Sequence, residues 1–294
     1  MLVVLAAVGG LQQSTVPGLP VVPGVTLWSL PLIVWVRDIA MAATVGFILI
    51  GGVLAPRPDT RSGRLASGSA LVWLGALVAQ AVLTVSEVLA LPLSSAVNTA
   101  LIWPLLTQTT VGTVILLQCS LVAAVALLGW VILGRVTGSI LLAACLIAAF
   151  LPGFTGHAGV VEGHAGATVS LGLHIVAASV WVGGLLAVVD YSHRNAKAAQ
   201  LVLRRFSAVA LVCVVILGES GLVNAATRLD GVSPLLTSTY GAVLLAKIAV
   251  LCALIGVGLR QRSQLRASDD TDLGLIDEKS RGLGREWRAS PALA

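Results

Sequence analysis

The stretch 167-ATVSLGLHIVAASVWVGGLLAVVD-190 decides the fold of this chain. Its 24 residues hold a single ionisable side chain, His174, before the terminal Asp190. An α-helix of about 20 apolar residues is long enough to cross a hydrocarbon core about 30 Å thick. A helix also satisfies its own backbone hydrogen bonds, which lipid cannot do. The stretch therefore predicts a membrane-spanning helix.

Further blocks of the same kind lie along the chain, at 31–54, 68–90, 110–134, 138–154, 206–226 and 238–259. The block 2–11 is too short to cross alone, and no basic residue precedes it as in a signal peptide. We interpret it as a shortened first helix. The predicted fold is all-α: a polytopic membrane helix bundle of about eight transmembrane helices, forming one domain over 1–266.

The composition excludes a soluble fold, because 57% of the residues are hydrophobic and 11% are charged, against about 25% charged in soluble domains. The partner that this implies is the lipid bilayer; the net charge of +5 does not indicate nucleic acid. Residues 267–294 carry mixed charge and are expected to form a cytoplasmic, mostly disordered tail. No catalytic domain or phosphate-binding glycine loop is recognisable, so an enzyme is not expected.

Basic residues gather in alternate loops, which predicts the topology. The loops 91–109, 155–166 and 227–239 hold one basic residue, Arg228. Because positive loops face the cytoplasm, we expect a protein of the cytoplasmic membrane with both termini inside and 155–166 outside. The loops expected inside carry eleven basic residues: Arg57, Arg61, Arg64, Arg135, Arg194, Lys197, Arg204, Arg205, Arg260, Arg262 and Arg266.

Ionisable residues inside predicted spans are costly and usually face a bundle interior or a wet cavity. On the predicted topology each lies in the outer half of the membrane, with Arg37 and Asp38 about two turns in. This favours one intramembrane polar cluster around a cavity open to the outside. Lys247 would oppose a cation there unless it pairs with a carboxylate, for which Glu87, Glu219 and Asp38 are candidates. The residues are Arg37, Asp38, Glu87, His174, Glu219 and Lys247.

Three of the four histidines fall within eighteen residues, in and after 156-GHAGVVEGHAG-166. His157 and His164 share a face if this segment is helical, and its glycines let both rings reach one ion if it is a loop. Glu162 adds a carboxylate, and His174 lies below them in the next span. Imidazole is a good ligand for Cu(II), Zn(II) and Ni(II). The pattern predicts a metal site at the outer mouth.

Three motifs, in order, resemble the copper resistance protein D (CopD) family. The first is 157-HAGVVEGHAGATVSLGLHIVAASVWVGGL-185, similar to the family's H-x-x-A-A-x-x-W-x-G-G-L helix. The second is the R-F-S helix 204-RRFSAVALVCVVILGESGLVNA-225. The third, 236-LTSTYGAVLLAKIAVLCALIGVGLRQR-262, is similar to a T-x-Y-G-x-x-L-x-x-K helix with a basic exit. The likeness covers about 150–265, and the first half agrees by hydropathy alone.

The resemblance implies an eight-helix protein that takes up copper across the inner membrane and serves copper resistance and homeostasis. By motif, His157, His164 and His174 inherit the copper role. Trp181, Gly183 and Gly184 inherit a packing role, and Tyr240 and Lys247 match positions in the last motif. No further copper-binding domain is recognised, so a separate periplasmic copper carrier is an expected partner. Cu(I) or Cu(II), and the oligomeric state, stay open.

Other readings of the same residues stay open. A membrane factor that metallates a respiratory enzyme without transport would bind the metal equally well. A proton-coupled carrier would use Glu219 and His174 as relay groups. A bis-histidine haem cytochrome needs paired histidines on different helices, and His174 is the single histidine within a predicted span.

Overall fold

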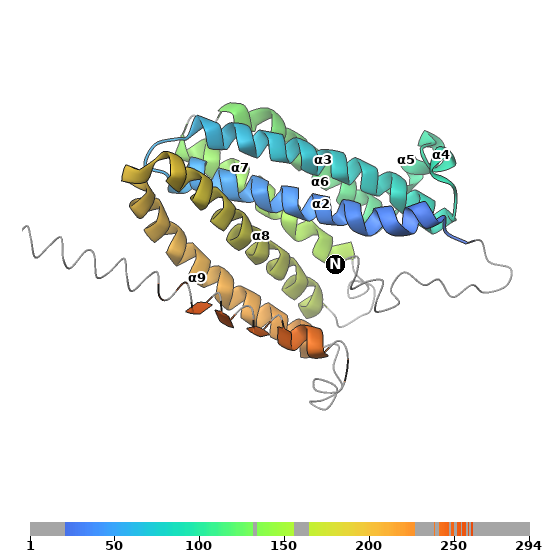
Figure 1. Ribbon diagram of the computed structural model, residues 1–294. Helices are drawn as coiled ribbons and strands as arrows, with labels where there is room; N and C mark the ends of the chain where they lie inside the picture. Colours follow the sequence, from blue (N-terminus) through green and yellow to red (C-terminus); the bar gives the residue numbers. More distant parts are fainter. Residues whose placement is uncertain are drawn as a thin grey trace, which may run out of the picture. The chain divides into compact units, whose positions relative to one another are not determined.

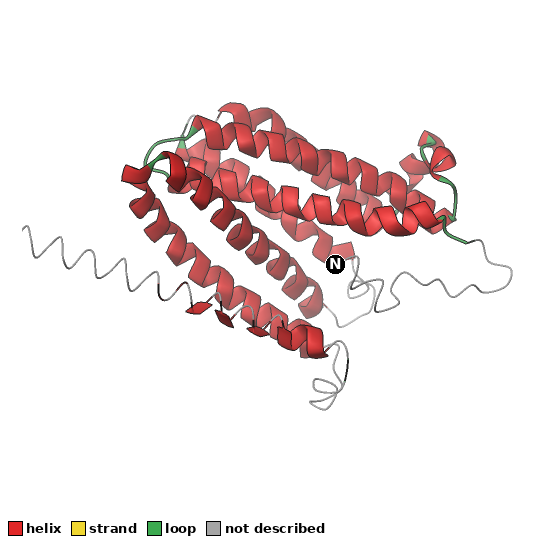
Figure 2. Cartoon of the chain, viewed as in Figure 1, coloured by secondary structure: helices red, strands yellow, loops and turns green. Residues whose placement is uncertain are grey.

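The structure is a computed structural model that describes residues 21–131, 134–155 and 165–226, and beyond them 238, 241–246, 248–249, 252–253, 255–256, 258 and 260. Its regular elements in these ranges are helices (Figure 2). Two compact units are distinguished, Met1–Arg228 and Leu229–Ala294. In the second unit, Ser238 caps a helical segment, because its Oγ accepts a hydrogen bond of 3.0 Å from the N–H of Gly241.

Six of the described helices are long and apolar enough to cross a membrane. This confirms the all-α membrane bundle, while the predicted number of about eight spans goes beyond what these ranges include. The predicted first helix 2–11 and the tail 267–294 lie outside the described residues. The six are Gly24–Leu54, Thr60–Leu89, Thr110–Leu128, Arg135–Thr155, Thr168–Arg194 and Ala196–Val223.

The helices α2 (Gly24–Ile48) and α3 (Thr60–Leu89) form a long antiparallel pair. α2 continues as the π-helix η1 (Leu49–Leu54) before the chain turns into α3. Polar contacts tie the pair together near both ends: Thr26 Oγ1 lies 2.6 Å from Ser86 Oγ, and Thr44 Oγ1 donates to Ser69 Oγ at 2.9 Å. Such hydrogen bonds favour helix association where lipid offers no hydrophobic drive.

The remaining long helices are α6 (Thr110–Leu128), α7 (Arg135–Phe150), α8 (Ala165–Arg194) and α9 (Ala196–Ala226). α3 packs on α6, and α6 packs on α7. α8 contacts α2 along one side and α9 along the other (Figure 1). The core between them includes the fully buried Trp73.

Two differences from the predicted elements have local causes. The segment 91–109, expected as a loop, contains α4 (Leu93–Ala96) and α5 (Thr99–Gln108). α5 can begin there because the Asn98 side chain accepts a hydrogen bond from the Ala100 N–H, which caps the helix. α2 begins seven residues before the predicted 31, because hydropathy locates a span without marking the residue at which its helix begins.

Glycines allow the closest helix contacts of the bundle. A methyl group at Gly183 of α8 would overlap the Ala42 carbonyl of α2, and one at Gly46 would overlap the Gly183 carbonyl. A methyl group at Gly184 would overlap the ring of Phe206 on α9. α8 therefore lies between two neighbours at distances that a larger side chain would prevent.

Candidate functional site

His174 lies on the α8–α9 seam, partly buried, with its Nδ1 2.9 Å from the Ser220 Oγ of α9. On the same seam, Ser170 Oγ donates to the Ser220 carbonyl oxygen at 3.2 Å. Both serines are almost fully buried. His174 is thus held by hydrogen bonding inside the bundle.

The other predicted metal ligands, His157, Glu162 and His164, lie outside the described residues. The described part of the chain contains no group of three or more His, Cys, Asp or Glu side chains that could hold a metal. His174 is therefore the one predicted ligand that can be placed, and the metal site as a set stays a prediction.

Arg37 and Asp38 form an ion pair on α2. Arg37 Nη2 lies 2.7 Å from Asp38 Oδ1, and Arg37 Nη1 donates to Gln80 Oε1 of α3 at 2.9 Å. The Arg37 side chain is 13% exposed. Since α2 begins at Gly24, Arg37 lies about 20 Å from the helix start. This is farther from the helix start than the predicted two turns, which were counted from residue 31, and the depth of Arg37 in the membrane stays a prediction.

The rest of the predicted intramembrane cluster is dispersed or not described. Glu87 is exposed in the last turn of α3, and Glu219 is exposed on α9 beside the buried Ser220. Lys247 lies outside the described residues. The contacts described bring Arg37 and Asp38 together but join neither to Glu87 or Glu219. The single outward cavity stays a prediction.

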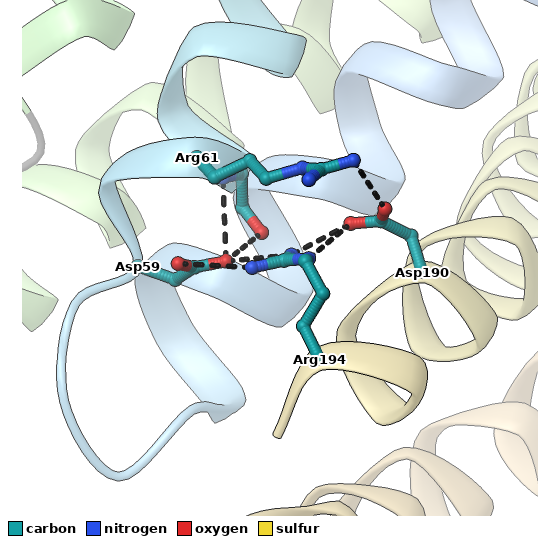
Figure 3. A network of polar contacts seen from close by, with 5 residues as sticks. Asp59, Arg61, Asp190 and Arg194 are labelled. Carbon is teal, nitrogen blue, oxygen red and sulfur yellow. Dashed lines mark hydrogen bonds and ion pairs between the residues drawn. The ribbon is translucent and has the colours of Figure 1, made fainter. Parts of the chain in front are cut away.

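A second polar group joins the end of α8 to the start of α3 (Figure 3). Arg194 Nη2 lies 2.9 Å from Asp59 Oδ2 and 2.6 Å from Asp190 Oδ2. Arg61 reaches Asp190 at 3.4 Å. Asp59 also caps α3, because its carboxylate accepts hydrogen bonds from the Ser62 N–H and hydroxyl. We call these four residues, Asp59, Arg61, Asp190 and Arg194, the end clasp.

Neighbouring contacts place three of the predicted basic loops at one end of the first unit. Arg205 of α9 donates from Nη1 to the Leu54 carbonyl oxygen at 2.7 Å. Gly138, in the first turn of α7 after Arg135, lies so near Gly52 that an added Cβ would be 2.8 Å from the Gly52 oxygen. The basic residues after α2, at the start of α7 and between α8 and α9 therefore share an end with the end clasp.

The pKa of Asp59 is lower than its usual value. Burial by itself raises it, but the hydrogen bonds from Arg194 and Ser62 and the charge of Arg194 outweigh burial. A carboxyl with a lowered folded-state pKa stabilises the fold above its unfolded pKa of about 3.9. That stabilisation is lost as the pH falls through the folded-state pKa.

We therefore expect Asp59→Asn to lower the thermal unfolding temperature in detergent at pH 7, with a gap from wild type that shrinks at about pH 3. The stabilisation from the ionised carboxylate starts to decline as the pH falls below the unfolded pKa of about 3.9, so the gap is smaller at about pH 3 and closes once the pH is below the folded-state pKa. Thermal unfolding of both proteins at the two pH values measures this. A gap of equal size at both pH values would contradict the role of the ionised carboxylate.

Sequence reasoning missed the end clasp and the two serines. Asp190 and Arg194 are four residues apart at the end of a span, a spacing that places them on one helix face, and this signal was present. No comparable signal pointed to Asp59 as the partner of Arg194, because 135 positions separate them. Serine is a common residue in membrane helices, so the sequence around Ser170 and Ser220 does not predict which residues they hydrogen-bond.

Comparisons with known proteins cover most of the chain, although the matched family models do not include residues 168–199. The family model for copper resistance protein D-like, N-terminal domain, matches residues 25–167, and that for copper resistance protein D matches residues 200–288. The copper transport protein CutJ of Bacillus subtilis (strain 168) is 32% identical over 139 residues. That match covers 46% of this chain and 25% of the relative, so the chain spans one quarter of the relative's length.

No solved structure matches the chain. The N-terminal match covers the half for which the sequence resemblance rested on hydropathy alone. Two family models in the expected order, together with six apolar helices, agree with one another. The chain is a multi-pass membrane protein and belongs to the copper resistance protein D family.

Proposed function

We propose that this protein handles copper at the cytoplasmic membrane and carries the ion inward from a histidine site on the outer side. Two observations support copper: the family membership and the 32% identity to a protein named as a copper transport protein. The main support for a copper route through the membrane is the position of His174. It is an imidazole inside a membrane bundle, held on the α8–α9 seam by Ser220.

The proposed capture site combines His157 and His164 with Glu162, ahead of His174 in the chain. Imidazole nitrogen binds copper in either common oxidation state, and a carboxylate adds attraction for the cation. α8 begins at Ala165, directly after His164 of the capture site, and His174 lies nine residues further along. That is about 13 Å along the helix. Copper would pass from the outer histidines to His174.

We infer the proposed orientation of the protein in the membrane from the end of the bundle that carries the basic loops. Positively charged loops stay in the cytoplasm during membrane insertion, so the end clasp faces inside and the start of α8 faces outside. Arg37 and Asp38 neutralise each other, so they leave no net positive charge on α2 to repel a cation. A periplasmic copper carrier as donor also belongs to the proposal.

The test compares cellular copper in cells that express wild type or the triple variant His157→Ala/His164→Ala/His174→Ala. We expect wild type to raise cytoplasmic copper and the variant to lose that increase at equal abundance in the membrane. The matched control is His193→Ala, because His193 is exposed near the opposite end of α8. That variant should keep wild-type uptake.

Two results would contradict the proposal in different ways. If purified wild type binds copper but neither protein changes cellular copper, the protein is a binding or metallation factor and transport is wrong. If the triple variant binds and accumulates copper like wild type, the histidine segment is not the site.

A further inference from the structure

We propose that Ser220 is a positioning residue that holds His174 as the tautomer with its proton on Nδ1. The lone pair of the ring then lies on Nε2. Only the step from this tautomer to copper ligation rests on the proposed function. The tautomer itself follows from the hydrogen bonds of α9 and α8.

The first step concerns the Ser220 hydroxyl. A serine hydroxyl has one hydrogen to donate, whereas its oxygen can accept. Ser220 Oγ donates to the carbonyl oxygen of Ile216, one turn earlier in α9. A carbonyl oxygen can only accept, so the hydroxyl hydrogen belongs to this bond. Serines inside helices commonly make this bond to the residue four positions earlier.

The second step concerns the imidazole ring. Ser220 Oγ and His174 Nδ1 are 2.9 Å apart, which is hydrogen-bond distance. Since the serine hydrogen already points to Ile216, the hydrogen between Oγ and Nδ1 must come from the ring. A neutral imidazole has one N–H. The proton therefore lies on Nδ1, and Nε2 carries the lone pair.

The third step explains why Ser220 can fix the tautomer of His174. Its side chain is buried, with 5% of the residue exposed, so water does not compete for the hydroxyl. Ser170 donates to the Ser220 carbonyl at 3.2 Å and so ties α8 to α9 one turn from His174. Ligating histidines in metalloproteins characteristically donate their other ring N–H to an oxygen, which fixes tautomer and orientation. Ser220 is in this position, and it assigns copper to Nε2.

The test uses the full chain in lipid bilayers, with ¹⁵N-labelled histidine and no metal, at a pH where imidazole is neutral. The ¹⁵N shifts of Nδ1 and Nε2 distinguish the two tautomers, and His174→Gln identifies the His174 signals. We expect wild type to show the Nδ1–H form. In Ser220→Ala the acceptor is gone, so the Nε2–H form should become populated.

Ser170→Ala is the matched control. It removes a serine hydroxyl from the same seam and breaks a bond to the same residue, but that bond goes to the Ser220 carbonyl oxygen and leaves the Ser220 hydroxyl in place. We expect it to keep the wild-type tautomer. If Ser220→Ala also keeps it, or if Ser170→Ala shifts it equally, the positioning role of Ser220 is wrong.

Copper titration of the same proteins separates this inference from the proposed function. We expect Ser220→Ala to bind copper about 10- to 100-fold more weakly, the usual effect of losing such an outer partner, and Ser170→Ala to bind like wild type. A shifted tautomer with unchanged copper affinity would support the positioning role and show that His174 is not a copper ligand. An unshifted tautomer would overturn the positioning role whatever the affinity.

Discussion

Gly183→Ala is expected to destabilise the protein by roughly 1–3 kcal/mol or more, a typical cost of overpacking a close-packed core. The added methyl group would overlap the Ala42 carbonyl of α2, and Gly46 N is the next atom in its way at 3.1 Å. These are backbone atoms, so no rotamer change can make room and α8 has to move away from α2. The measurement is the thermal unfolding temperature of purified protein in one detergent.

The matched control is Gly75→Ala on α3, where an added Cβ meets nothing within 4 Å. In a helix interior alanine is better than glycine by about 0.5–1 kcal/mol, so this variant should be neutral or slightly more stable. The same substitution is thus expected to lower the stability at Gly183 but not at Gly75. If Gly183→Ala unfolds no earlier than Gly75→Ala, the α2–α8 contact does not limit stability.

Arg194→Ala is expected to cost about 1–3 kcal/mol, the range for losing hydrogen bonds to charged groups. Arg194 bridges Asp59 and Asp190, and the three side chains are 21%, 16% and 25% exposed. Its removal leaves two half-buried carboxylates without their shared cation and frees the start of α3 from the end of α8. Thermal unfolding at pH 7 measures the loss.

Arg61→Ala is the matched control for this prediction. Arg61 contacts the same Asp190, but at 3.4 Å and with 57% of its side chain exposed. Exposed ion pairs contribute about 0–1 kcal/mol because water and salt screen them, so the variant should unfold close to wild type. Equal losses in the two arginine variants would show that net charge at this end, and not the bridge, stabilises the fold.

The sequence predicted the helices well because crossing a membrane is a local requirement. Each long apolar block imposes a helix whatever its neighbours are, since lipid cannot satisfy backbone groups. The predicted stretch 167–190 lies within α8, Ala165–Arg194. The sequence also showed the alternation of basic loops, and the contacts of Arg194 and Arg205 place two of them, between α2 and α3 and between α8 and α9, at one end.

Which helix faces meet was decided by the tertiary structure. Trp28 and Trp73 both lie in apolar helices, yet Trp28 is 50% exposed and Trp73 is fully buried. Their neighbours do not distinguish them, because lipid-facing and core-facing positions of a membrane helix are equally apolar. The amphipathic pattern that orients a soluble helix is therefore absent.

The sequence by itself determined an apolar helical membrane protein, and it predicted polar residues within the spans and a set of metal ligands. Only the tertiary structure decided which partners those residues have. It paired Arg37 with Gln80 and His174 with Ser220, across 43 and 46 positions of chain. The physical reason is that hydropathy acts on each segment separately, whereas a buried hydrogen bond needs two side chains brought to about 3 Å by the packing of whole helices.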